Sequence, residues 1–176
     1  QSTSTSDTAV SGTLGSSETL TITEGDKTAT VSLTSDMTIS DIVNAVNTEL
    51  DTVYTETLIG DQQLYEGSGG GTALSATTTW DQVYLDGATS ANLADSDVIS
   101  FSGTTRSGGS VSGSYTIDDA SADTVQGLLN EIESVYGNDV DASIDSSGRL
   151  VITDESAGGS DLAISFDYSQ AHDLTF

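Results

Sequence analysis

Carboxylates are the side chains most able to do chemistry in this sequence, because it has 28 Asp and Glu residues and only three Lys and Arg residues. Asp139, Asp141 and Asp145 are closely spaced, and carboxylate oxygens are the ligands that Ca²⁺ prefers. The spacing does not fit an EF-hand loop, since Ile144 stands where that loop needs glycine and no helix–loop–helix pattern surrounds it. We therefore expect no defined metal centre and no cofactor. An irregular calcium site on these three aspartates is the alternative.

The sequence contains few of the residues that nucleophilic catalysis requires. The chain has no cysteine, and its single histidine, His172, lies beside Asp173 with no serine in a nucleophile-elbow motif. Acid pairs such as Asp95 with Asp97 could in principle flank a glycosidic bond. Such pairs arise by chance in so acidic a chain, and we predict that the protein is not an enzyme.

The charge balance narrows the class of partner. The net charge is −25, and the only basic residues are Lys27, Arg106 and Arg149. Nucleic acid and anionic membranes are both recognised by clustered Lys and Arg, so we expect neither as a partner. No stretch approaches the roughly 18 apolar residues of a membrane-spanning helix. The scattered acids indicate a solvated, self-repelling surface.

Two amphipathic helices organise the chain. Apolar residues spaced i, i+3, i+4, i+7 and i+11 predict one helix over 38–50, with Thr38 and Asp41 as a capping box. The same spacing predicts a second helix over 124–136, each apolar position lying 86 residues after its counterpart. We expect these two faces to form two structural cores: Ile39, Ile42, Val43, Val46 and Leu50 in the first, and Val125, Leu128, Leu129, Ile132 and Tyr136 in the second.

Segments that alternate apolar with polar residues predict strands around both helices. Residues 19–23 and 28–33 predict one hairpin, and 54–59 with 63–65 predict another, closed by a strand at 72–77. Around the second helix the predicted strands are 98–101, 111–117, 140–144, 149–153 and 162–166. Trp80, the only tryptophan, is expected in a core or an interface.

This order predicts an α+β protein of two small repeated units, each a mainly antiparallel sheet packed against one amphipathic helix. We place a linker or frayed N-terminus at 1–9, the first unit at 10–79, a connector at 80–94 and the second unit at 95–176. The chain begins without Met and without a signal-like apolar run, so we expect a processed chain or a piece of a longer one.

Both units resemble parts of flagellar axial proteins. One region resembles the short repeat shared by flagellins and hook-associated proteins, namely residues 12–14, 20–22, 31–33 and 37–47. A second region resembles the outer head domains of the same proteins, namely residues 97–104, 124–132 and 142–154. Within the flagellin and hook-associated superfamily, the nearest match is the head of hook-associated protein 2, the filament cap.

The resemblance implies a structural function outside the cell, on the bacterial flagellum, in filament assembly or surface contact. It implies other flagellar axial proteins and a host or surface receptor as partners, and a homo-oligomer in the full-length protein. Neither end of the chain carries the long heptad-patterned helix of such proteins, which implies the exposed head region alone. Two alternatives stay open: an outer domain of flagellin, hook or hook–filament junction protein, and a calcium- or glycan-binding adhesin module.

Overall fold

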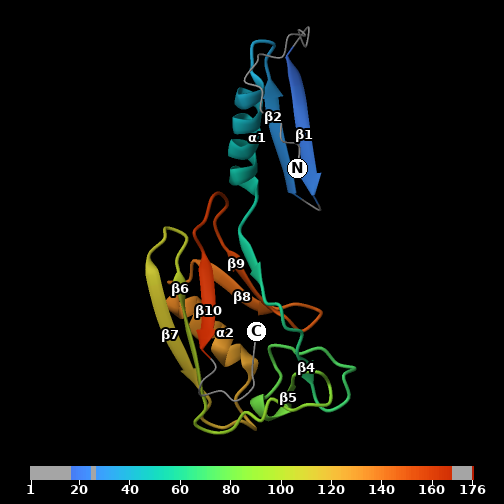
Figure 1. Ribbon diagram of the computed structural model, residues 1–176, viewed down its shortest axis with the longest axis vertical. Helices are drawn as coiled ribbons and strands as arrows, with labels where there is room; N and C mark the ends of the chain where they lie inside the picture. Colours follow the sequence, from blue (N-terminus) through green and yellow to red (C-terminus); the bar gives the residue numbers. More distant parts are fainter. Residues whose placement is uncertain (1–16, 25–26, 168–175) are drawn as a thin grey trace. The chain divides into compact units, whose positions relative to one another are not determined.

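The computed structural model describes residues 17–24, 27–167 and 176. The chain divides into two compact units, one ending at Thr55 and the other beginning at Glu56, with Ala157–Gly159 grouped with the first. Figure 1 shows the elements of both units. Small antiparallel sheets and two helices confirm the α+β class. The linker predicted at 1–9 and the histidine His172 lie outside the described residues.

The first unit is a two-stranded hairpin packed against one helix. Strand β1 (Glu18–Glu24) pairs antiparallel with β2 (Lys27–Leu33), and helix α1 (Ile39–Val53) packs on β2. The helix begins with the predicted capping box. The amide of Asp41 donates to the Thr38 hydroxyl at 3.1 Å, and the amide of Thr38 donates to the Asp41 carboxylate at 2.8 Å. These bonds satisfy backbone donors that the first helical turn leaves unpaired.

The core of the first unit is smaller than the helix pattern predicts. Ala29 and Val31 of β2 are buried, but no residue of α1 is fully buried, and Val43 is 50% exposed. The other four predicted positions are only half-buried: Ile39, Ile42, Val46 and Leu50. The prediction that these five residues form a fully buried core is therefore wrong. Two strands offer too little apolar surface to cover the whole stripe of a four-turn helix.

The second unit combines the second helix with two three-stranded antiparallel sheets. One sheet has the strand order β10-β6-β7 and the other the order β3-β9-β8. Helix α2 (Val125–Val135) packs against β7 of one sheet and β8 of the other. The strands are β3 (Thr57–Ile59), β4 (Tyr65–Glu66), β5 (Val83–Tyr84), β6 (Val98–Thr104), β7 (Ser110–Thr116), β8 (Val140–Ile144), β9 (Leu150–Asp154) and β10 (Ala163–Asp167), with a 3₁₀ turn η1 at Trp80–Gln82.

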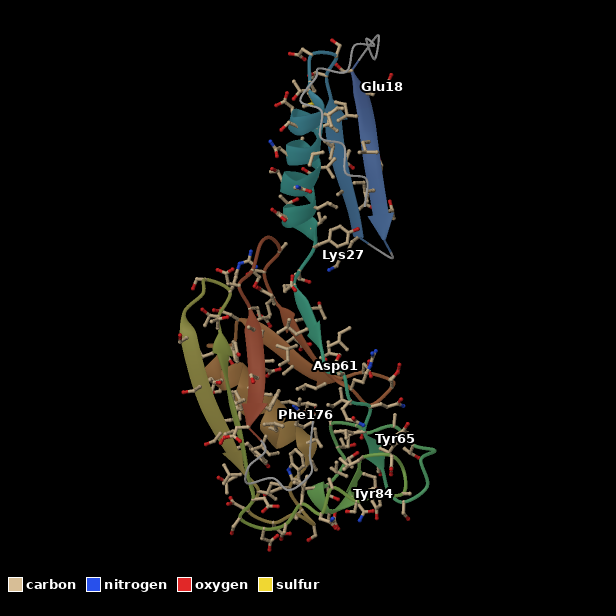
Figure 2. All side chains as sticks on the ribbon, viewed as in Figure 1. Glu18, Lys27, Asp61, Tyr65, Tyr84 and Phe176 are labelled. Carbon is tan, nitrogen blue, oxygen red and sulfur yellow. The ribbon has the colours of Figure 1, made fainter. Side chains whose placement is uncertain are left out.

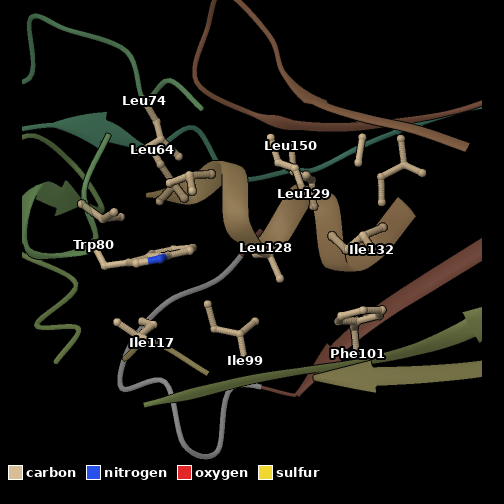
Figure 3. Close-up of a cluster of buried hydrophobic side chains, with 14 of the residues drawn as sticks. Leu64, Leu74, Trp80, Ile99, Phe101, Ile117, Leu128, Leu129, Ile132 and Leu150 are labelled. Atoms are coloured by element: carbon tan, nitrogen blue, oxygen red, sulfur yellow. The ribbon is translucent and has the colours of Figure 1, made fainter. Parts of the chain in front are cut away.

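One hydrophobic core surrounds α2. Figure 3 shows the helix with Leu150 on one side and Ile99 and Phe101 of β6 on the other. The five residues predicted for this helix face are at most 2% exposed: Val125, Leu128, Leu129, Ile132 and Tyr136. The buried Trp80 packs against Tyr115 with ring centroids 5.8 Å apart and ring planes tilted by 40°. Glycine at 127 allows this packing, because a Cβ there would lie 2.5 Å from the Tyr115 hydroxyl oxygen.

The boundary between the units differs from the predicted one. Strand β3 pairs with β9 instead of forming a hairpin with 63–65, and β4 pairs with β5. Residues 72–77 form no strand beyond a single bridge from Ala73 to Tyr65. The segment expected as a connector, 80–94, supplies Trp80, Val83, Ala91 and Leu93 to the core of the second unit. An alternating pattern identifies a strand but not its partner, which explains the difference.

Leu129→Ala is expected to lower the free energy of unfolding by about 2–5 kcal/mol, because it leaves a cavity where a leucine is fully buried. Val43→Ala on the first helix removes a half-exposed side chain and should change stability by less than about 0.5 kcal/mol. Urea unfolding followed by far-ultraviolet circular dichroism measures both changes. Equal losses for the two variants would contradict the burial described for the two helix faces.

Candidate functional site

The three aspartates proposed as calcium ligands do not converge. Asp141 lies within β8, Asp139 precedes that strand and Asp145 follows it. A strand rises about 3.3 Å per residue, so the Cα atoms of Asp141 and Asp145 are about 13 Å apart. The carboxylate oxygens that bind one Ca²⁺ each lie about 2.4 Å from the ion and therefore close to one another. Over residues 17–24, 27–167 and 176, no three His, Cys, Asp or Glu side chains gather as a metal-binding group. The structure thus argues against this candidate set.

Asp145 closes the turn between β8 and β9. Its carboxylate accepts hydrogen bonds from the amides of Ser147 at 2.8 Å and Arg149 at 3.0 Å. The Arg149 guanidinium lies 2.8 Å from the same carboxylate. The bond from the Arg149 amide is the main reason that the pKa of the Asp145 carboxyl lies below its ordinary value. The oxygens expected to bind calcium therefore stabilise a turn.

The carboxylates of the acid pair Asp95 and Asp97 also accept hydrogen bonds from backbone amides. Asp95 accepts a hydrogen bond from the amide of Ala120 at 2.8 Å, and Asp97 accepts one from the amide of Ala94 at 2.8 Å. A carboxylate that accepts a hydrogen bond from a backbone amide fixes the conformation of a loop. The loop of Ala94 precedes β6, and the loop of Ala120 precedes α2. These contacts give the pair a structural role.

A buried carboxylate is the main electrostatic feature of the second unit. Asp154, at the end of β9, is 1% exposed, and its Oδ2 lies 3.0 Å from Nη1 of Arg106. The Ser160 hydroxyl donates to Oδ2 at 2.8 Å, and the Ser156 amide donates to Oδ1 at 2.8 Å. These contacts, which we call the Asp154 clamp, join the loop after β6 to the segment between β9 and β10. Nothing in the spacing of Arg106 and Asp154 along the chain indicates this pairing.

The clamp keeps Asp154 ionised. Burial raises the pKa of the Asp154 carboxyl, but hydrogen bonds from Ser156, Ser160 and Arg106 outweigh burial, and the pKa lies below its ordinary value. A general acid or base needs a pKa near the operating pH and access to a substrate. This carboxylate has neither property, so the clamp is a structural centre.

An apolar groove of about 440 Å³ opens beside strands β3, β9 and β10 of the second unit. Among its lining residues only Asp61 is charged, and Figure 2 labels Asp61 together with Phe176, which also lines the groove. The apolar lining includes Leu58, Ile59, Leu150, Ile152, Ile164 and Phe166. Concave apolar surface with few polar groups is typical of binding sites. This groove is the candidate site, and residue spacing alone did not indicate it.

All three basic side chains already form ion pairs or hydrogen bonds within the chain. Besides the two arginine pairs, Lys27 Nζ donates to the Thr55 hydroxyl at 3.3 Å and lies 5.7 Å from the ring centroid of Tyr54. All three cations therefore contact groups of their own unit. No described basic side chain is left to build the positive patch that phosphate recognition requires.

Comparison with known proteins adds no relative. The chain matches no protein-family model, no curated protein and no solved structure. Across the part of the chain that the structure describes, no helix is both long and apolar enough to cross a membrane.

Arg106→Met is expected to lower the free energy of unfolding of the second unit by about 3 kcal/mol, because it leaves the buried Asp154 carboxylate without its charged partner. Arg149→Met breaks the more exposed pair with Asp145 and should cost about 1 kcal/mol or less. Urea unfolding followed by the fluorescence of Trp80, the sole tryptophan, reports on the second unit alone. Similar losses for the two variants would argue against the clamp.

The clamp also predicts a dependence on pH. Since the pKa of Asp154 is lowered in the folded state, its ionised form contributes stability above the unfolded pKa of about 3.9, and that stability is lost as the pH falls toward the folded pKa. The difference in unfolding free energy between the parent and Asp154→Asn should be constant from about pH 7 to 5 and shrink below about pH 4. Urea titrations at each pH measure it, and a difference unchanged down to about pH 2 would refute the assignment.

Proposed function

We propose that the chain forms outer domains of a bacterial flagellar axial protein, with the filament cap as the nearest candidate. The observation that carries this proposal is a shared element order. In each unit a hairpin leads into an amphipathic helix with threonine at its N-cap, as β1-β2-α1 with Thr38 and as β6-β7-α2 with Thr124. The resemblance to flagellar axial proteins rests on β1, β2 and α1 in the first unit and on β6, α2, β8 and β9 in the second.

We also infer that the two units derive from one repeated segment. The equal spacing of the apolar helix positions, 86 residues apart, supports this inference. The units diverge after the helix, since the first continues into β3 of the second unit, whereas the second adds the hairpin β8-β9. Duplication followed by divergence of the closing strands accounts for both observations.

The physical properties of the chain suit a structural role outside the cell. The acid pair Asp95 and Asp97 holds loop backbone, and Asp145 and Asp154 are used in a turn and in the Asp154 clamp. The acidic surface keeps neighbouring heads hydrated and apart. Export through a flagellar channel requires an unfolded chain, and the absence of cysteine means that no disulfide opposes unfolding. In this proposal the partners are other axial proteins and, within the full-length protein, further copies that assemble through segments outside these two units.

Antibodies raised against the chain are expected to label the flagella of the source bacterium in immunogold electron microscopy. Label at the filament tip supports the cap, label along the shaft supports flagellin, and label at the base supports the hook or junction protein. Antibodies absorbed beforehand with the purified chain are the control. Label on the cell body, with flagella left bare, would reject the proposal.

A further inference from the structure

We propose that the apolar groove of the second unit binds an extended peptide strand of a neutral or basic partner protein, which pairs with the outer edge of β3. The proposal does not depend on a flagellar function. It rests on the backbone of β3, on the side chains of the groove and on the charge of the chain.

The backbone of β3 offers hydrogen bonds to a further strand. β3 is an edge strand of the sheet β3-β9-β8. Its bonds to β9 flank Leu58: the Glu56 carbonyl accepts from a β9 amide at 2.9 Å, and the Gly60 amide donates to a β9 carbonyl at 2.8 Å. Because backbone groups alternate between the two sides of an antiparallel strand, those of Thr57 and Ile59 face away from β9. An added strand would pair with them.

β3 is short, with three residues, but it lacks the charged side chains and proline that protect many edge strands. Proteins block edges with charged side chains or proline. β3 consists of Thr57, Leu58 and Ile59, and the whole chain contains no proline. Ile59 is 50% exposed, the one large hydrophobic residue so exposed in the described part of the second unit. By contrast, the edge strand β8 carries the exposed Asp141.

The groove lies along this edge and accepts large apolar side chains. Thr57 and Ile59 line it, together with Phe166 of β10. Phe176 of the chain itself already packs there: its ring centroid is 5.1 Å from that of Phe166, and its backbone carbon would lie 3.1 Å from a Cβ at Gly60. A strand paired with β3 would direct every second side chain to one face, so an alternating apolar peptide fits this groove.

Charge selects the partner. The chain carries a net charge of −25, and each of its three basic side chains is engaged within its own unit. Asp61 adds a negative charge at the groove itself. A second copy of the chain or an acidic segment would be repelled, whereas an apolar strand flanked by Lys or Arg would be attracted. The occupant is therefore a strand from a different protein.

A fluorescein-labelled peptide of sequence KVTITVTK is the probe, and fluorescence anisotropy with the full chain is the measurement. The matched control has the same sequence and charge but carries N-methyl groups on alternate residues, which block strand pairing. At about 0.3 M sodium chloride, where long-range attraction is screened, the probe should bind at least about tenfold more tightly than the control. No binding, or equal binding of both peptides, overturns the proposal.

Two lysine substitutions locate the site. Ile59→Lys places a charge on the β3 edge and should weaken binding of the probe at least about tenfold. Val43→Lys adds the same charge at a residue of the first unit that is also 50% exposed, and should leave binding unchanged. Circular dichroism verifies that both variants fold. Equal losses of binding would mean that the peptide senses only overall charge, which overturns the proposal.

Hydrogen exchange tests the register. The amides of Thr57 and Ile59 should become protected when the peptide binds, while the amide of Leu58, already paired with β9, should be protected with or without it. Unchanged exchange at Thr57 and Ile59 would overturn strand pairing.

Sedimentation of the free chain tests whether a second copy occupies the edge of β3. Self-association that Ile59→Lys abolishes would assign this edge to a second copy and overturn the choice of a different protein.

Discussion

Burial of one helix between two incomplete sheets is the constraint on which the second unit depends. Neither three-stranded sheet of this unit could bury an apolar face alone, and α2 offers a stripe that is apolar enough for both. Its buried residues meet Phe101 from one sheet and Leu150 from the other (Figure 3). The Asp154 clamp joins loops at the edge of this core and pairs the buried Asp154 carboxylate.

In the first unit the helix is covered by a single small sheet on one side only. Its helix has a similar apolar stripe, but it meets only a two-stranded hairpin, and no helical residue becomes fully buried. Less apolar area removed from water means less stabilisation, so the first unit is expected to be the weaker of the two. In an exported structural protein, such a unit would unfold with little resistance.

The acidic composition has two consequences in this structure. Many aspartates replace the missing prolines as turn formers, since a carboxylate can hold a backbone amide, as Asp145 does with Ser147 and Arg149. The remaining negative charge of the chain repels acidic partners from its surface, which includes the apolar groove beside β3. In the peptide complex that we propose, backbone hydrogen bonds and apolar contacts would define the site, and charge would decide which partner approaches.

The sequence alone was enough to locate the elements whose partners are adjacent in the chain. Helical periodicity placed α2 and its buried residues, the Thr38 capping box placed the start of α1, and alternation placed the hairpins β1-β2 and β8-β9. The pairing of β3 with β9, the burial of Asp154 and the groove were decided by tertiary structure. Periodicity specifies which face of an element is apolar, but not which distant element covers it. For the same reason, the exposure of Val43 depended on the size of the sheet that its helix met.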